Sequence, residues 1–122
     1  MKLHIHKIND EKIAEVVSDG IAVHKVQDML DIMADANYQG AINMIINESN
    51  IVPDFFNLKT RLAGEILQKF SNYNMRLAIV GKFERYQSES LQAFMIESNR
   101  GDRVFFVPDV QTAKQKLTGN NL

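Results

Sequence analysis

The segment GKFERYQS, residues 81–88, is the densest group of side chains that could bind a ligand. A second polar group follows another apolar run, in the loop 47–56. In open α/β sheets, ligands bind outside the carboxyl ends of the strands, where both loops are expected to lie. The alternative is a solvated loop in which a serine only caps a helix. The first loop supplies Lys82, Glu84, Arg85, Tyr86 and Ser88, and the second supplies Glu48, Asn50 and Asp54.

The sequence shows no motif for a specific reaction. A carboxylate near a base does not identify a catalyst by itself. The chain contains neither GxxxxGK[ST] nor GxGxxG, so a nucleotide or dinucleotide cofactor has no support, and it contains no GxSxG elbow. We therefore expect no catalytic residue and no cofactor. A small-molecule-binding protein or enzyme that uses the strand-end loops is the alternative.

The histidines are the other group with possible chemistry. His4 and His6 share one face of a predicted strand and could chelate a metal ion, and His24 is the only further imidazole. Zinc sites need three or four convergent ligands, which this spacing does not provide. The chain has no cysteine, which excludes disulfides, thiolate metal sites and thiol catalysis. We expect no metal site.

The segment FNLKTRLAGEILQKF, residues 56–70, suggests a contact surface. Its apolar residues have helical spacing, yet Thr60 and Arg61 open it and Gly64 lies inside it. A glycine within a helix costs about 1 kcal/mol relative to alanine. Close packing of the helix on the sheet would offset that cost, and so would contact with another subunit; we favour the sheet. A partner surface is predicted at Thr60, Arg61 and Gly64, with Lys82, Arg85 and Tyr86 beside them.

The apolar patterns place these residues on one α/β domain that covers residues 1–122. An opening antiparallel hairpin is followed by short apolar strands that alternate with amphipathic helices. Such alternation implies right-handed crossovers and a mixed, mostly parallel sheet. The final TGNNL is expected to fray. The predicted order is β-β-α-β-α-β-α-β-α, with strands at 2–8, 12–17, 41–46, 75–80 and 103–107 and helices at 24–38, 56–70, 88–98 and from 109.

The overall composition excludes several classes of protein. Lys and Arg number 14 against 15 Asp and Glu, a net charge of −1, which argues against a nucleic-acid partner because phosphate neutralisation needs a basic excess. No polybasic run is present for an anionic membrane, and no apolar run approaches the length of a membrane span. These features, with the lack of cysteine, predict a cytoplasmic protein.

Long strings of the chain resemble a bacterial family of domains of unknown function, number 4180. The resemblance rests on DFFNLKTRLAGEILQKFSNYNMRLAIVGKF (54–83), RYQSESLQAFMIESNRG (85–101) and VFFV (104–107). It covers nearly the whole chain. What it implies about activity is limited, because the family's activity is unknown.

The predicted order of elements is also similar to the STAS domain, the fold of anti-sigma-factor antagonists. Those antagonists switch by phosphorylation of a serine at the start of the helix after the third strand. The resemblance places Lys59 at that position and Thr60 beside it, so the standard switch is not expected. It implies a regulatory, non-enzymatic module that binds a protein partner or forms a homodimer.

Overall fold

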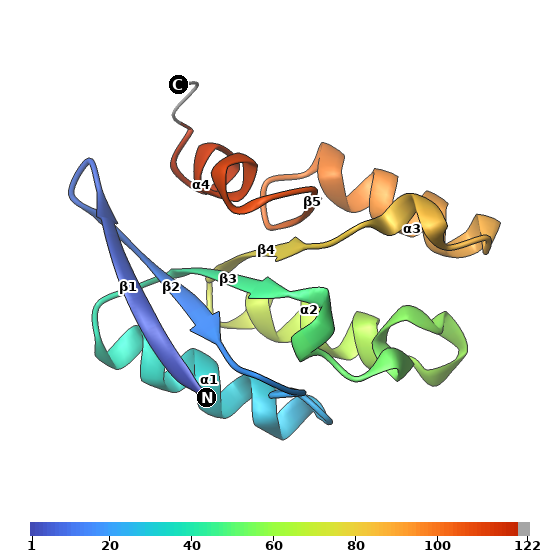
Figure 1. Ribbon diagram of the computed structural model, residues 1–122, viewed down its shortest axis with the longest axis horizontal. Helices are drawn as coiled ribbons and strands as arrows, with labels where there is room; N and C mark the ends of the chain where they lie inside the picture. Colours follow the sequence, from blue (N-terminus) through green and yellow to red (C-terminus); the bar gives the residue numbers. More distant parts are fainter. Residues whose placement is uncertain (120–122) are drawn as a thin grey trace.

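The computed structural model describes residues 1–119, which form a single mixed α/β domain with one central sheet (Figure 1). The predicted order of strands and helices is confirmed. Residues 120–122, where fraying was expected, lie outside the described residues, whereas Thr118 is still helical. The strands are β1 (Lys2–Ile8), β2 (Glu11–Val17), β3 (Asn43–Asn47), β4 (Arg76–Val80) and β5 (Val104–Val107). The helices are α1 (Val26–Tyr38), α2 (Leu62–Asn72), α3 (Glu89–Arg100) and α4 (Val110–Thr118).

The five strands lie side by side in chain order. β1 and β2 form the expected antiparallel hairpin, and every later pair is parallel. Each crossover steps in the same direction across the sheet, so right-handed connections place α1, α2 and α3 on one face. α4 follows the last strand and packs on the opposite face, as Figure 1 shows. The carboxyl ends of β3, β4 and β5 therefore meet at one edge.

Each face of the sheet buries its own hydrophobic core. The larger core joins the sheet to α1, α2 and α3, and it includes Ile46, Ile66 and Phe70. The smaller core lies under α4, where Ala113 and Leu117 are fully buried. β3 and β4 are buried on both faces, which explains why they appear as unbroken apolar runs.

The main error in the predicted boundaries concerns the start of α2. The sequence predicted a helix from residue 56, but α2 begins at Leu62, after two short 3₁₀ turns at Pro53–Phe56 and Leu58–Thr60. Phe55 and Phe56 are buried, but they belong to a turn. In the sequence, two buried apolar residues of a turn look the same as the apolar face of a helix. The left-handed backbone of Arg61, with φ of 66°, separates the second turn from the helix.

Arg76, at the start of β4, fastens α4 to the sheet. Its guanidinium donates to the carbonyl oxygens of Leu117 at 2.6 Å and Lys116 at 3.2 Å, which lie in the last turn of α4. Its Nε donates to the carbonyl of Asp102 at 2.7 Å, and the cation lies 5.5 Å from the centre of the Phe105 ring. One cation thus satisfies carbonyls at the negative end of a helix and in the turn before β5.

We expect Arg76→Met to lower the free energy of unfolding by about 1–3 kcal/mol, because several hydrogen bonds from a charged donor are lost. Urea denaturation measures the change. Arg100→Met is the matched control. Within residues 1–119, the described side-chain contact of Arg100 is an exposed ion pair, 3.7 Å from Glu97, and its loss should change stability by less than about 1 kcal/mol. Equal effects of the two substitutions would contradict this role of Arg76.

Candidate functional site

The loops after β3 and β4 meet through the side chain of Glu48. Glu48 begins the short turn Glu48–Asn50 directly after β3, and Gly81 follows the last residue of β4. The Glu48 side chain is only 9% exposed and lies against Gly81. A Cβ atom at Gly81 would stand 2.6 Å from both Cδ and Oε1 of Glu48. A Cβ at this position would therefore force the Glu48 side chain to move.

Three donors converge on this carboxylate. The backbone N–H of Lys82 donates to Oε1 at 2.9 Å. The Tyr86 hydroxyl and Nη2 of Arg85 each donate to Oε2 at 2.8 Å. Nη2 of Arg85 also lies 3.1 Å from the Tyr86 oxygen. We refer to Glu48, Arg85 and Tyr86, with the Lys82 amide, as the Glu48 cluster.

Aromatic packing holds Tyr86 in place. Its ring stacks on Phe56, with ring centres 5.1 Å apart and planes 16° from parallel. Phe56 in turn lies 6.1 Å from Phe83, which meets Phe106 of β5 edge-on at 5.3 Å. On its outer side, the Arg85 guanidinium lies 5.0 Å from the centre of the Tyr86 ring. The cluster is thereby joined to the larger core and to three strand-end segments.

Two groups of the cluster have a raised pKa. Burial raises the pKa of the Tyr86 hydroxyl, and its hydrogen bond to Glu48 raises the pKa further. The pKa of the Arg85 guanidinium is also raised, by its contacts with Tyr86 and Glu48. Both groups therefore keep their protons at neutral pH. The carboxylate of Glu48 accepts three hydrogen bonds, so most of its acceptor capacity is used within the cluster.

The other residues predicted for the ligand loop lie apart from the cluster. Asn50 is buried, and its Nδ2 donates to the carbonyls of Ser18 at 3.0 Å and Gly20 at 2.8 Å. Ser88 is the N-cap of α3, where its Oγ accepts from the Leu91 amide at 3.2 Å. Asp54 and Glu84 are exposed. Neither side chain makes a described hydrogen bond or ion pair within residues 1–119, although the Asp54 carbonyl accepts from the Thr60 hydroxyl.

The residues predicted at the start of α2 form a separate group. The Thr60 hydroxyl donates to the carbonyls of Asp54 at 2.7 Å and Asn57 at 2.8 Å, and it accepts from the Leu62 amide at 3.3 Å. Thr60 therefore joins the two 3₁₀ turns to the helix. The expectation that Gly64 allows α2 to approach the sheet is wrong, because a Cβ there would meet no atom within 4 Å. Gly64 lies on the outer face of the helix.

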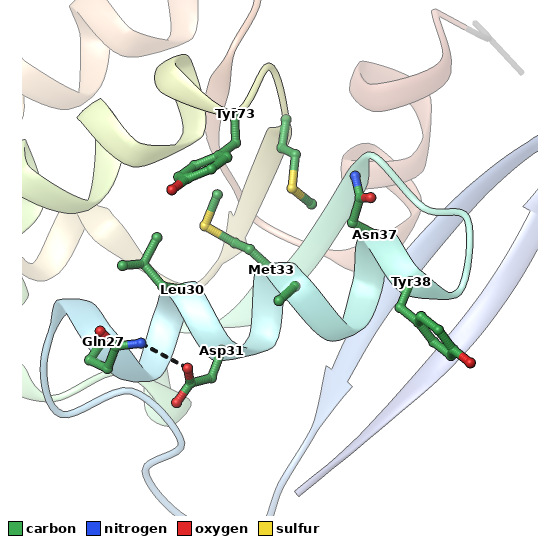
Figure 2. Close-up of a pocket in the computed structure, with 9 residues that line it drawn as sticks. Gln27, Leu30, Asp31, Met33, Asn37, Tyr38 and Tyr73 are labelled. Atoms are coloured by element: carbon green, nitrogen blue, oxygen red, sulfur yellow. Dashed lines mark hydrogen bonds between the residues drawn. The ribbon is translucent and has the colours of Figure 1, made fainter.

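A further groove, of about 630 Å³, lies between α1 and the end of α2, and the sequence did not indicate it (Figure 2). Figure 2 shows Tyr73 on one side of the groove and Leu30 and Met33 of α1 on the other. Tyr73 follows the last helical residue of α2 and is 62% exposed. The carboxylate of Asp31 accepts a hydrogen bond from the Gln27 amide at 2.8 Å. The charged group of this groove is therefore already partnered within α1.

The histidines of β1 do not form a metal site with their neighbours. Nε2 of His6 lies 2.7 Å from Oε1 of Glu15 on β2, and the His4 ring meets the His6 ring edge-on at 4.5 Å. Within residues 1–119, no three His, Asp or Glu side chains converge closely enough to hold a metal ion.

None of the helices in this part of the chain is long and apolar enough to cross a membrane.

Comparison with protein families supports the resemblance seen in the sequence. The family model described as "Domain of unknown function (DUF4180)" matches residues 8–117, nearly the whole domain. The chain belongs to this family. Neither the curated proteins nor the solved structures include a significant match.

We expect Gly81→Ala to lower the free energy of unfolding by about 1–3 kcal/mol, because the new methyl group overlaps Glu48 and displaces its hydrogen bonds. In a Glu48→Ala background the same change should be nearly neutral, since the overlap is gone. Chemical denaturation of the four proteins gives the coupling free energy. Additive effects would show that Gly81 is needed for another reason.

Proposed function

We propose that this DUF4180 domain is a non-enzymatic module that binds a protein partner through the outer face of α2. The observation that carries the proposal is Gly64, whose position in the first turn of a helix has no steric reason within residues 1–119. The cost of about 1 kcal/mol relative to alanine is thus not offset by packing inside the domain. Residues that lower the local stability of the fold are expected at functional sites.

Arg61 adds a second local cost beside Gly64. Its backbone is left-handed, which is unfavourable for residues with a side chain and is normally filled by glycine. The side chain of Arg61 is exposed and makes no described hydrogen bond or ion pair within residues 1–119. The presence of arginine at this unfavourable backbone position supports a contact between its guanidinium and another protein.

The surface around these residues is shaped to receive a side chain. A shallow hollow of about 790 Å³ opens at Gly64, and partly buried Val26, Leu58 and Phe94 supply its apolar part. Arg61, Glu65 and Lys69 line it as well, so cations outnumber carboxylates. We refer to this region as the α2 surface. It suits an apolar side chain of a partner flanked by a carboxylate, which Arg61 would bind.

The topology is consistent with a wider proposal of a STAS-like regulatory module in the cytoplasm. The order β-β-α-β-α-β-α-β-α is the one on which that resemblance was based. Lys59 holds the acceptor position, and Thr60 lies beside it in the turn before α2, with its hydroxyl engaged in three hydrogen bonds. Recognition by contact, rather than a phosphorylation switch, is therefore the form of regulation that we propose.

Gly64→Ala should raise the free energy of unfolding by about 0.5–1 kcal/mol, because alanine is the better helix former and its methyl group meets open space. Urea denaturation tests this. Gly119→Ala is the control and should destabilise the domain, since Gly119 has a φ of 69°. A loss of stability in Gly64→Ala would remove the main support for the α2 surface.

Affinity capture from the source cells tests the partner itself. We expect Gly64→Gln and Arg61→Glu each to reduce recovery of the partner at least about tenfold, as is common for residues at the centre of an interface. Lys7→Glu, a charge reversal on the distant strand β1, should leave recovery unchanged. If sedimentation shows a dimer that Gly64→Gln dissociates, the partner is a second copy of the chain. Identical proteins recovered with all four baits would refute the proposal.

A further inference from the structure

Beside the Glu48 cluster, the carboxyl edge of the sheet is hollowed to about 450 Å³. This volume lies within the range of small-molecule sites, which are mostly apolar with a few fixed polar groups. The apolar lining comes from Ile21, Ile51, Pro53 and Phe56. Arg85 and Tyr86 line the same hollow, which we call the strand-end hollow.

Among the described residues that line this hollow, Arg85 is the charged donor with N–H groups that no described partner uses. Only its Nη2 has described partners within residues 1–119, namely Glu48 and the Tyr86 oxygen. Its side chain is 60% exposed, so the remaining N–H groups are open to a ligand. The guanidinium is nevertheless held in place by the Glu48 carboxylate and the face of the Tyr86 ring. A guanidinium that is positioned in advance loses less entropy when it binds a planar anion through two hydrogen bonds.

The charge of the hollow limits the anion that it can take. Arg85 is the only cation among the residues of 1–119 that line the hollow, and Glu48 places a negative charge in the same space. A phosphate dianion would gain one cation and face one carboxylate, whereas phosphate sites normally combine several donors or cations. A monocarboxylate carries half that charge and matches the planar fork of an arginine.

From these observations we propose that the strand-end hollow binds a small organic monocarboxylate with an apolar body. Its carboxylate pairs with the outer N–H groups of Arg85. Its hydrocarbon part lies against Ile51, Pro53 and Phe56. Glu48 also lines the hollow, but its carboxylate already accepts three hydrogen bonds, so its role is to position Arg85 and Tyr86. This site is separate from the α2 surface, so the two proposals can fail independently.

The test is an amide-resonance NMR titration of the full chain with phenylacetate, its neutral analogue phenylacetamide, and inorganic phosphate. We expect phenylacetate to shift resonances of the loops 47–56 and 81–88, and to bind at least about tenfold more tightly than the other two probes. Arg85→Gln should remove this preference for the carboxylate. Arg100→Gln, which changes an exposed arginine on α3, should bind like the native chain.

Arg85→Lys keeps the charge but loses the planar fork, and it should bind phenylacetate several-fold more weakly than the native chain. This variant also covers the case in which Arg85→Gln fails to fold. Equal affinity for phenylacetate and phenylacetamide in the native chain would overturn the proposal. So would tighter binding of phosphate, shifts confined to other regions, an unchanged preference in Arg85→Gln, or native affinity for phenylacetate in Arg85→Lys.

Discussion

The side chain of Glu48 is the constraint on which the carboxyl edge of the sheet depends. Glu48 follows the last residue of β3, and its side chain lies against Gly81. Its carboxylate accepts hydrogen bonds from the loop after β4. A carboxylate this buried must be satisfied, because an unpaired buried charge is strongly unfavourable. Three donors meet that requirement, and in doing so they fix the positions of Arg85 and Tyr86. The geometry of the strand-end hollow follows from this one interaction.

The topology explains why that interaction is possible. Strands laid down in chain order, with every crossover in the same direction, place the ends of β3, β4 and β5 next to one another. The same rule gathers α1, α2 and α3 on one face, so the outer side of α2 is left exposed over a continuous core. α4, held by Arg76, closes part of the opposite face. One folding pattern therefore generates both surfaces for which we propose functions.

The two surfaces differ in how their local chemistry is satisfied. At the strand-end hollow, the Glu48 carboxylate is paired within the domain, while Arg85 keeps N–H groups that have no described partner within residues 1–119. At the α2 surface, Arg61 has a left-handed backbone and Gly64 lies within a helix, and no described contact inside the domain offsets either cost. The first arrangement resembles a site prepared for a small ligand, and the second resembles a surface completed by another protein.

The amino-acid pattern alone determined the order of the elements, the antiparallel hairpin and the mostly parallel sheet, because apolar periodicity directly reports which faces are buried. It also marked Glu48, Arg85 and Tyr86, since polar residues after buried strands must lie at the sheet edge. It misplaced the start of α2, because buried Phe55 and Phe56 belong to a turn. It also predicted that Gly64 faces the sheet, whereas Gly64 faces open space. Only the tertiary structure decided that Glu48 reaches Gly81 and Tyr86 stacks on Phe56, because these contacts join segments 30 or more residues apart and depend on side-chain packing that no local spacing encodes.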